Sequence, residues 1–239
     1  MKDQVVLIVG GSGGVGTASA KLFSKAGAKI VLAARNRDKA EATAKEINSS
    51  GGEAYVIDVD VTDSESVDKM TSDVISELGK VDVLINAFGL GVIKPLLDVE
   101  PANAKEVIDV NVYGTFLVTR SVLKHMAEAK SGKVVMIPGI LGKAVMRGSS
   151  VYSASKFAVT GMTKALVDEH KRSNVKFTLM YLGGIDTPFW DSDMIDMRVQ
   201  RDKMLTTDEV AKAIYYAINQ PGNSVLNEIV IQPDSHQMV

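Results

Sequence analysis

Two residues of this chain, Tyr152 and Lys156, have the chemistry and the spacing to move a proton. On an α-helix, side chains four positions apart share a face, with their Cβ atoms about 5–6 Å apart. The ammonium of Lys156 would favour the phenolate of Tyr152 and lower its pKa from about 10 toward a working pH for acid–base catalysis. The same spacing also occurs with a packed tyrosine and a solvated lysine, so the rest of the chain must decide.

A glycine-rich turn follows the first apolar run, Val5–Val9, and precedes a helical pattern. It fits both Gly11-x-Gly13-x-x-Gly16 and Gly10-x-x-x-Gly14-x-Gly16. Glycines let the backbone approach a phosphate closely, and the free amides of a helix start attract negative charge. The alternative is a tight turn that binds nothing. We expect a dinucleotide diphosphate to bind at Gly10, Ser12, Gly13, Gly14, Val15 and Gly16.

The same turn contains Gly10-x-Ser12-x-Gly14, the pattern of a hydrolase nucleophile elbow. An elbow this early in the chain has no preceding strands to build its sheet and oxyanion loop. The three histidines, His125, His170 and His236, are expected near helix ends and in the C-terminal tail, without an active-site context. The sequence therefore disfavours a hydrolase.

The second predicted strand ends at Ala34 and is followed by Arg35 and Asn36. An acidic residue here would bind the ribose 2′-hydroxyl of NAD. The guanidinium of Arg35 can instead pair with the 2′-phosphate of NADP. We therefore expect NADP rather than NAD, with Arg35 and Asn36 in its site; the alternative is a solvated loop cation.

Asp60 and Val61 follow the third predicted strand, where they would meet the adenine of the cofactor. An equally good interpretation is that this segment only begins the next helix. In that case Thr62 or Asp63 would be the N-cap residue. Both interpretations stay open at this point.

Short β-branched runs alternate with longer helical patterns, as in parallel strands joined by crossover helices. No composition break, linker or repeat divides the chain, so the pattern predicts one doubly wound α/β domain. The predicted strands are Val5–Val9, Lys29–Ala34, Ala54–Asp58, Val81–Asn86, Lys133–Ile137, Lys176–Tyr181 and Glu228–Ile231. The predicted helices lie near 15–26, 37–49, 64–78, 101–128, 151–172 and 207–219.

Composition excludes several classes of function. The 239 residues carry a formal net charge of −2 with no basic block, which argues against nucleic acid or an anionic membrane as partner. The absence of cysteine excludes disulfides, thiolate metal sites and a cysteine nucleophile, and we expect no metal. Without a signal-peptide pattern or a long apolar run, we expect a cytoplasmic protein.

Taken together, the motifs resemble those of the short-chain dehydrogenase/reductase family over essentially the whole chain. They are Gly10-x-x-x-Gly14-x-Gly16, Asp60-Val61, Asn86-Ala87-Phe88-Gly89, Asn111-Val-Tyr-Gly114 and Tyr152-x-x-x-Lys156. The resemblance implies a single Rossmann-like domain over residues 1–239, with a seven-stranded parallel sheet and helices on both faces. It also implies hydride transfer between a nicotinamide and a carbonyl or alcohol carbon, in a homotetramer or homodimer.

The resemblance further implies residue roles. Tyr152 would exchange the proton, Lys156 would hold the nicotinamide ribose and lower the tyrosine pKa, and Asn111 would anchor a water. Beyond the residues already named, the implied cofactor contacts are Asn86, Ala87, Gly89, Tyr152, Lys156, Gly183, Ile185 and Thr187. Of these, the backbone of Ile185 and the hydroxyl of Thr187 would reach the carboxamide.

The residue Asn111 also needs a partner on physical grounds. Val107, Asn111, Gly114 and Val118 share one helical face, so an amide lies in an apolar stripe, where an unpaired polar group is costly. A bound water or a carbonyl exposed by a local kink would satisfy it. A simple structural hydrogen bond is the alternative.

The main departure from the family lies at Gly139, where the substrate-polarising serine is expected, thirteen residues before Tyr152. Losing one donor to a developing oxyanion typically costs about 10²–10³ in rate, or roughly 3–4 kcal/mol. Tyr152 could still donate to the same oxygen. Ser149 and Ser150 are weak candidates to replace the hydroxyl, and their alternative role is to begin the Tyr152 helix. Ala87 and Phe88 are smaller departures that would reshape the nicotinamide wall.

Two hypotheses about function follow. The first is an NADP-dependent oxidoreductase acting on a small-molecule carbonyl or alcohol, with a lid near 188–204 that carries apolar side chains such as Phe189. Ordinary packing is the alternative for those side chains. Lys143 or Arg147 could anchor an acidic substrate or simply face solvent. The second hypothesis, motivated by Gly139 and Ala87, is a non-catalytic NADP(H)-binding or regulatory protein.

Overall fold

The computed structural model describes residues 1–221 and 223–238. Within them, the short apolar runs form a seven-stranded parallel sheet whose order is β3-β2-β1-β4-β5-β6-β7. The inner strands are buried on both faces, which explains their continuous rather than alternating apolar pattern. The strands are β1 (Val5–Val9), β2 (Lys29–Ala34), β3 (Glu53–Asp58), β4 (Val83–Asn86), β5 (Gly132–Met136), β6 (Val175–Leu182) and β7 (Glu228–Ile231).

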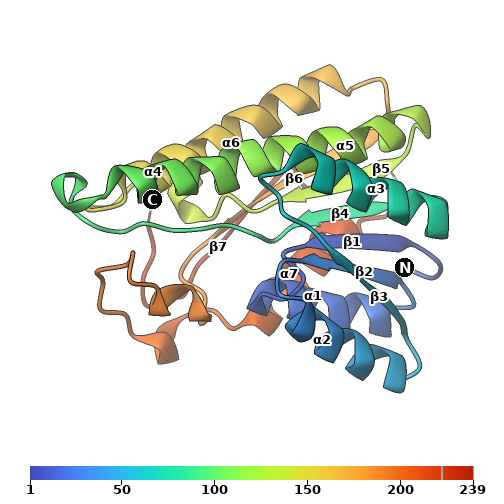
Figure 1. Cartoon of the computed structure of the whole chain (residues 1–239), viewed down its shortest axis with the longest axis horizontal. Helices are drawn as coiled ribbons and strands as arrows, with labels where there is room; N and C mark the ends of the chain where they lie inside the picture. Colours follow the sequence, from blue (N-terminus) through green and yellow to red (C-terminus); the bar gives the residue numbers. More distant parts are fainter. Residues whose placement is uncertain (222, 239) are drawn as a thin grey trace.

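Helices cover both faces of the sheet (Figure 1). They are α1 (Gly14–Lys25), α2 (Arg37–Ser49), α3 (Ser64–Leu78), α4 (Pro101–Ile108), α5 (Thr115–Glu128), α6 (Ser150–Glu169) and α7 (Thr207–Ile218). Phe23 and Ile214 bring α1 and α7, together with α2, into one hydrophobic cluster. Met70, Val118 and Val159 bring α3, α5 and α6 into the cluster on the opposite face. This is the Rossmann-like, doubly wound arrangement that the sequence predicts.

All seven predicted strands are present, with ends that differ by no more than two residues. The predicted helices near 15–26, 37–49, 64–78 and 207–219 are also confirmed within one residue at each end. The helix predicted over 151–172 begins one residue earlier and ends at Glu169. Gly79, just past α3, has a left-handed backbone with φ +77°, as its place after a helix indicates.

The helix predicted over 101–128 is present with these bounds, but it is not α-helical throughout. A π-helical turn, Asp109–Gly114, separates α4 from α5. Such a turn widens the helix by one residue and is frequent at functional sites. Here it contains Asn111, whose amide bonds to Leu90 and Ser155 outside this helix, so the alternative of a structural hydrogen bond is the one observed rather than a carbonyl exposed by a kink.

Candidate active site

The candidate site lies in the crevice where the order of the sheet reverses, between the carboxyl ends of β1 and β4. Gly10, directly after β1, has φ +89°, and a Cβ there would lie 2.7 Å from the main chain of Ala87 and Phe88. The Ala87 N–H also donates to the Val9 carbonyl at 2.8 Å. Only glycine therefore allows these two loops to meet.

The turn between β1 and α1 forms a tightly packed glycine cradle. A Cβ on Gly16 would lie 2.4 Å from the carbonyl oxygen of Gly10, and one on Gly14 would lie 3.1 Å from Cγ2 of Thr187. Gly13 is the N-cap of α1 and supplies no side chain to the free amides of the first turn. A cradle that a Cβ would fill, at the positive end of a helix, fits the diphosphate of a dinucleotide.

Arg35 and Asp60 lie exposed at the carboxyl ends of β2 and β3. Hydrogen bonds from the hydroxyl and amide of Thr62 to Asp60 hold the pKa of that carboxyl below its usual value, and the charge of Arg35 lowers it further. The same loop also begins a helix, because the carboxylate of Asp63 accepts from the Glu65 N–H at 3.0 Å. Asp63, not Thr62, is therefore the cap, which leaves Asp60 outside that role.

Three other predicted contacts have structural duties of their own. Asn36 caps α2 by accepting from the Lys39 N–H at 3.1 Å. The side chain of Val61 is buried, and a Cβ on Gly114 would lie 3.0 Å from it. The amide of Asn86 is also buried and donates to Thr119 at 3.3 Å. The side chains of Val61 and Asn86 thus belong to the core, which leaves their main chains for a cofactor.

Lys156 and Asn111 meet at Gly89, and Tyr152 lies beside Lys156. A Cβ on Gly89 would lie 3.0 Å from Nζ of Lys156 and 3.1 Å from Oδ1 of Asn111. Nζ of Lys156 also lies 5.5 Å from the centre of the Tyr152 ring. The π-helical turn, the loop after β4 and helix α6 therefore bring together the groups that the sequence singles out.

The electrostatics differ from the expectation. Burial raises the pKa of Tyr152 above its usual value, and no lowering by Lys156 offsets it. Burial also lowers the pKa of Lys156 to about 8. Desolvation disfavours the charged form of both groups, and here it outweighs their mutual attraction. Tyr152 is therefore a neutral phenol that can donate a proton.

The buried amide of Asn111 is satisfied by the protein itself. Its Oδ1 accepts from the Leu90 N–H, and its Nδ2 donates to the Leu90 carbonyl and to Oγ of Ser155, all within 2.9 Å. Ser155 in turn donates to the carbonyl of Tyr152 at 2.7 Å. Sequence reasoning missed Ser155, although its position three residues after Tyr152 on the same helix is a signal.

Gly139 follows β5 in a backbone conformation that serine rarely adopts. Its φ of +67° and ψ of 177° lie in a region used almost solely by glycine. A Cβ would meet only the Leu182 carbonyl, at 3.6 Å, so the restriction is conformational rather than steric. The loop has therefore adapted to the missing side chain.

Neither predicted substitute serine has a free, directed hydroxyl. The Ser149 hydroxyl is buried, donates to the Met146 carbonyl at 2.7 Å and lies 2.8 Å from Oγ of Ser153. Ser150 is exposed at the start of α6. The alternative role, opening the Tyr152 helix, fits both residues because Ser149 is the N-cap of α6 and Ser150 its first residue.

The segment after β6 returns to the glycine cradle. The Gly183 N–H donates to the Ile231 carbonyl at 2.8 Å, and a Cβ on Gly183 would lie 2.7 Å from Pro233. Ile185 forms a parallel bridge with Leu205, and Thr187 borders Gly14. These contacts hold Gly183, Ile185 and Thr187 on the same side of the crevice as α1.

Sequence reasoning gave Phe189 no specific position. Its ring centre lies 5.7 Å from that of Tyr152, at an interplanar angle of 35°. It also lies over Gly91, where a Cβ would be 2.2 Å from Cζ of the ring. The aromatic content of the segment was the available signal, but only the fold brings Phe189 to Tyr152.

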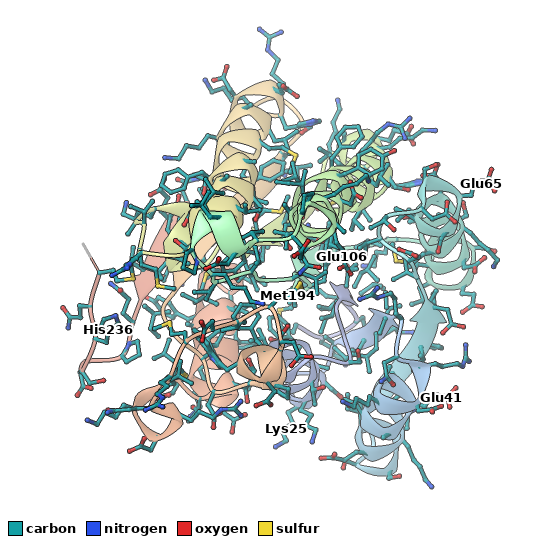
Figure 2. All side chains as sticks on the ribbon, turned by 60° about the vertical axis from the view of Figure 1, so that its left-hand side comes forward. Lys25, Glu41, Glu65, Glu106, Met194 and His236 are labelled. Atoms are coloured by element: carbon teal, nitrogen blue, oxygen red, sulfur yellow. The ribbon has the colours of Figure 1, made fainter. Side chains whose placement is uncertain are left out.

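Other candidate groups lie apart from this constellation. Lys143 is paired with Glu228 at 3.7 Å and lies over the Tyr181 ring. His170 is bonded to Ser173, and Figure 2 shows His236 at the edge of the molecule. In the part of the chain that the structure describes, no three His, Asp or Glu side chains could share a metal ion, and no helix could span a bilayer.

Comparisons with known proteins agree with this architecture. The model of the short chain dehydrogenase family matches residues 4–197. An uncharacterised oxidoreductase of Staphylococcus saprophyticus is 33% identical and aligns with 100% of this chain and 99% of its own. Levodione reductase superposes with a TM-score of 0.91 at 25% identity, covering 98% of both chains. A metagenomic short-chain oxidoreductase in complex with NADP superposes with a TM-score of 0.85 at 27% identity, also over 98% of both. Fold, motifs and relatives agree, and the chain belongs to the short-chain dehydrogenase family.

Proposed function

We propose that this protein is an NADP-dependent oxidoreductase that transfers a hydride between nicotinamide and a small carbonyl or alcohol substrate. The observation that carries the proposal is the position of Lys156, which lies against Gly89 with Asn111 on one side and near the ring of Tyr152 on the other. NADP rather than NAD is supported by the exposed Arg35 after β2 and by the NADP bound in the metagenomic relative.

The residues that would hold the cofactor follow from their places along the crevice. The cradle of Gly14 and Gly16 would hold the diphosphate, and Arg35 the 2′-phosphate. Lys156 would hold the nicotinamide ribose, while Ile185 and Thr187 would contact the carboxamide. When bound, NADPH supplies the hydride to the substrate carbon.

Tyr152 would supply the proton. Because burial keeps its pKa raised, the phenol is protonated at neutral pH and can donate from Oη to the carbonyl oxygen during reduction. A charged Lys156 nearby would stabilise the phenolate left behind. Asn111 and Ser155 keep the π-helical turn and α6 in contact, which holds the phenol and the ammonium in place.

Gly139 favours one rival, a non-catalytic NADP(H)-binding or regulatory protein. The position lacks a hydroxyl, and its backbone disfavours serine, so one preorganised donor is missing. Such a loss lowers the rate by about 10²–10³ without removing the proton donor. We therefore propose slow or altered catalysis rather than none.

The test is a panel of aldehydes, ketones and hydroxy acids with either nicotinamide. Tyr152→Phe should lower turnover by about 10²–10⁴-fold. Tyr113→Phe, which removes an exposed phenol on the π-helical turn, should leave it unchanged. Turnover that survives in Tyr152→Phe would defeat the proposal. Tight NADP binding by calorimetry with no turnover on the panel would favour the rival.

A further inference from the structure

The ring of Phe189 is built into the wall beside the candidate proton donor. It comes from the short turn Pro188–Asp191, and its centre lies 5.7 Å from that of Tyr152. The tip of the ring fills the space that the missing side chain of Gly91 leaves, because a Cβ there would be 2.2 Å from Cζ. Gly91 and Phe189, distant in sequence, thus form a matched pair.

Several contacts hold the ring in this position. Trp190 meets Phe189 edge-on, with ring centres 5.1 Å apart and planes at 87°. The indole Nε1 of Trp190 donates to the Ile185 carbonyl at 2.8 Å. Further along, the Ile93 N–H donates to the Met194 carbonyl at 2.9 Å, which joins this segment to the one that contains Gly91. Phe189 and Trp190 together form an aromatic wall, and hydrogen bonds anchor the segment that carries it at both ends.

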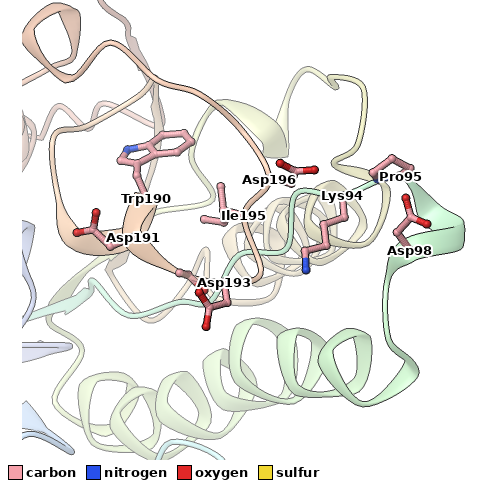
Figure 3. A pocket seen from close by; sticks show the side chains of 9 residues that line it. Lys94, Pro95, Asp98, Trp190, Asp191, Asp193, Ile195 and Asp196 are labelled. Carbon is pink, nitrogen blue, oxygen red and sulfur yellow. The ribbon is translucent and has the colours of Figure 1, made fainter.

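The charged groups near Phe189 and Trp190 disfavour the binding of an anionic substrate. Trp190 also lines a groove of about 630 Å³ (Figure 3). Its charged lining consists of Lys94, Asp98, Asp191, Asp193 and Asp196. Arg201 is committed to Asp191 and, at 3.6 Å, to Asp186. Lys143, considered above as an anchor for an acid, is paired with Glu228. A carboxylated substrate would meet net repulsion here.

We infer that Phe189 determines substrate specificity: it stacks on an uncharged planar group next to the reacting carbonyl and so selects aryl carbonyl compounds over carboxylated ones. The inference rests on the proposed function and names its substrate class. An offset pair of aromatic rings is more stable than an apolar contact of the same area. We therefore expect kcat/KM to be about 10-fold higher for a substrate with an aryl group than for one with a saturated ring.

Three aldehydes test the inference: benzaldehyde, cyclohexanecarbaldehyde and 4-carboxybenzaldehyde, each with NADPH and the full chain. For the unaltered protein, kcat/KM should be highest for benzaldehyde and lowest for the carboxylated compound. Phe189→Leu keeps an apolar wall and should remove most of the benzaldehyde preference over cyclohexanecarbaldehyde. Tyr216→Leu, an exposed aromatic on α7, should preserve it. A preference that Phe189→Leu does not change, or a preference for 4-carboxybenzaldehyde, overturns the inference.

A second measurement does not depend on turnover. Trp190 is the single tryptophan of the chain, and it contacts Phe189 directly. Benzaldehyde added with NADP⁺, a pair between which no hydride can pass, should change the tryptophan emission saturably, and Phe189→Leu should weaken that binding by about 10-fold. If emission saturates but no aldehyde is reduced in a Tyr152-dependent way, the proposed function fails and the aromatic wall stands. If reduction depends on Tyr152 but neither emission nor selectivity depends on Phe189, the wall fails and the proposed function stands.

Discussion

Asn111 and Leu90 are joined by two reciprocal hydrogen bonds of 2.8 Å, from the Leu90 N–H to Oδ1 and from Nδ2 to the Leu90 carbonyl. This pair ties the π-helical turn to the loop after β4, where Gly89 lies against Lys156. The amide therefore holds two sides of the candidate site together.

Replacing this amide by a carboxylate should separate stability from activity. Asn111→Asp sets an acceptor against the Leu90 carbonyl, and we expect a loss of roughly 1–3 kcal/mol in the free energy of unfolding. We also expect turnover to fall by about 10-fold or more, since the loop that sets Gly89 against Lys156 would lose a hydrogen bond that holds it. Urea denaturation and steady-state kinetics measure the two effects.

The chain contains a matched control for that change. Asn48 makes the same reciprocal pair with Ala54, at 2.7 and 3.0 Å, far from the crevice. Asn48 is exposed, so Asn48→Asp should lower stability less than Asn111→Asp and leave turnover unchanged. Equal losses of turnover in both variants would contradict a specific role for Asn111.

Gly139 should resist substitution for conformational reasons. Serine or alanine at φ +67° and ψ 177° is strained, so either variant should lose roughly 1–3 kcal/mol of stability. The added Cβ has room, which predicts similar losses for both. Gly161→Ala is the control: it lies in α6 with open space around it and should gain roughly 0.5–1 kcal/mol. A stable Gly139→Ser variant with faster turnover would show that the loop can rearrange.

Arg35 should carry the preference for a phosphorylated cofactor. Removing a charge-assisted hydrogen bond costs roughly 1.5–3 kcal/mol, so Arg35→Ala should weaken NADP⁺ binding about 10- to 100-fold and change NAD⁺ binding little. Arg37, two residues on, is paired with Glu41 at 2.6 Å and Asp58 at 2.8 Å and serves as the control. Titration calorimetry with both cofactors decides; equal losses for both cofactors in Arg35→Ala would refute the assignment.

Burial of Lys156 predicts a pH dependence of stability. Its pKa is about 8 in the fold and 10.5 when solvated, so between these values the unfolded chain binds more protons than the folded one. Stability from this group should rise by roughly 1–2 kcal/mol between pH 8 and 9.5. Tyr152, with a raised pKa, acts in the opposite direction only above pH 10. The Lys156→Met variant should not show this rise in stability. If the stability of the variant and of the unaltered protein changes with pH in the same way, the prediction is wrong.

The outer faces of the helices predict self-association. Ile108, Tyr113, Phe116 and Phe157 are each 40–47% exposed on α4, the π-helical turn, α5 and α6. Apolar side chains on both long helical segments are what pairing across a two-fold axis needs. Light scattering should give a dimer or tetramer, which Phe116→Glu with Phe157→Glu reduces to monomers. Tyr216→Glu on α7 should not change the mass, and a monomeric unaltered protein would exclude the proposal.

Much of the architecture follows from local sequence. The buried runs such as Val5–Val9 and Lys29–Ala34 specify strands because an all-apolar β-branched segment of this length suits a doubly covered sheet. Parallel strands bring their carboxyl ends to one edge, so the turns after them converge without any long-range information. That is why the glycine turn, Arg35 and Asp60 could be predicted at one edge of the sheet, whereas the family resemblance was needed to add Asn111, Tyr152 and Lys156 to them.

The chemistry at that edge depended on contacts that no local pattern contains. The pKa of Tyr152 is set by how deeply the ring is buried, which depends on packing from several elements. Asn111 could be predicted to need a partner, but Leu90 and Ser155 become its partners only through the π-helical turn. The sequence predicts only that Gly139 lacks the hydroxyl of a serine. The positive φ of its backbone is a property of the folded loop. Phe189 reaches Tyr152 because Gly91, far away in the chain, leaves room for its ring, and such complementarity is a property of the tertiary structure alone.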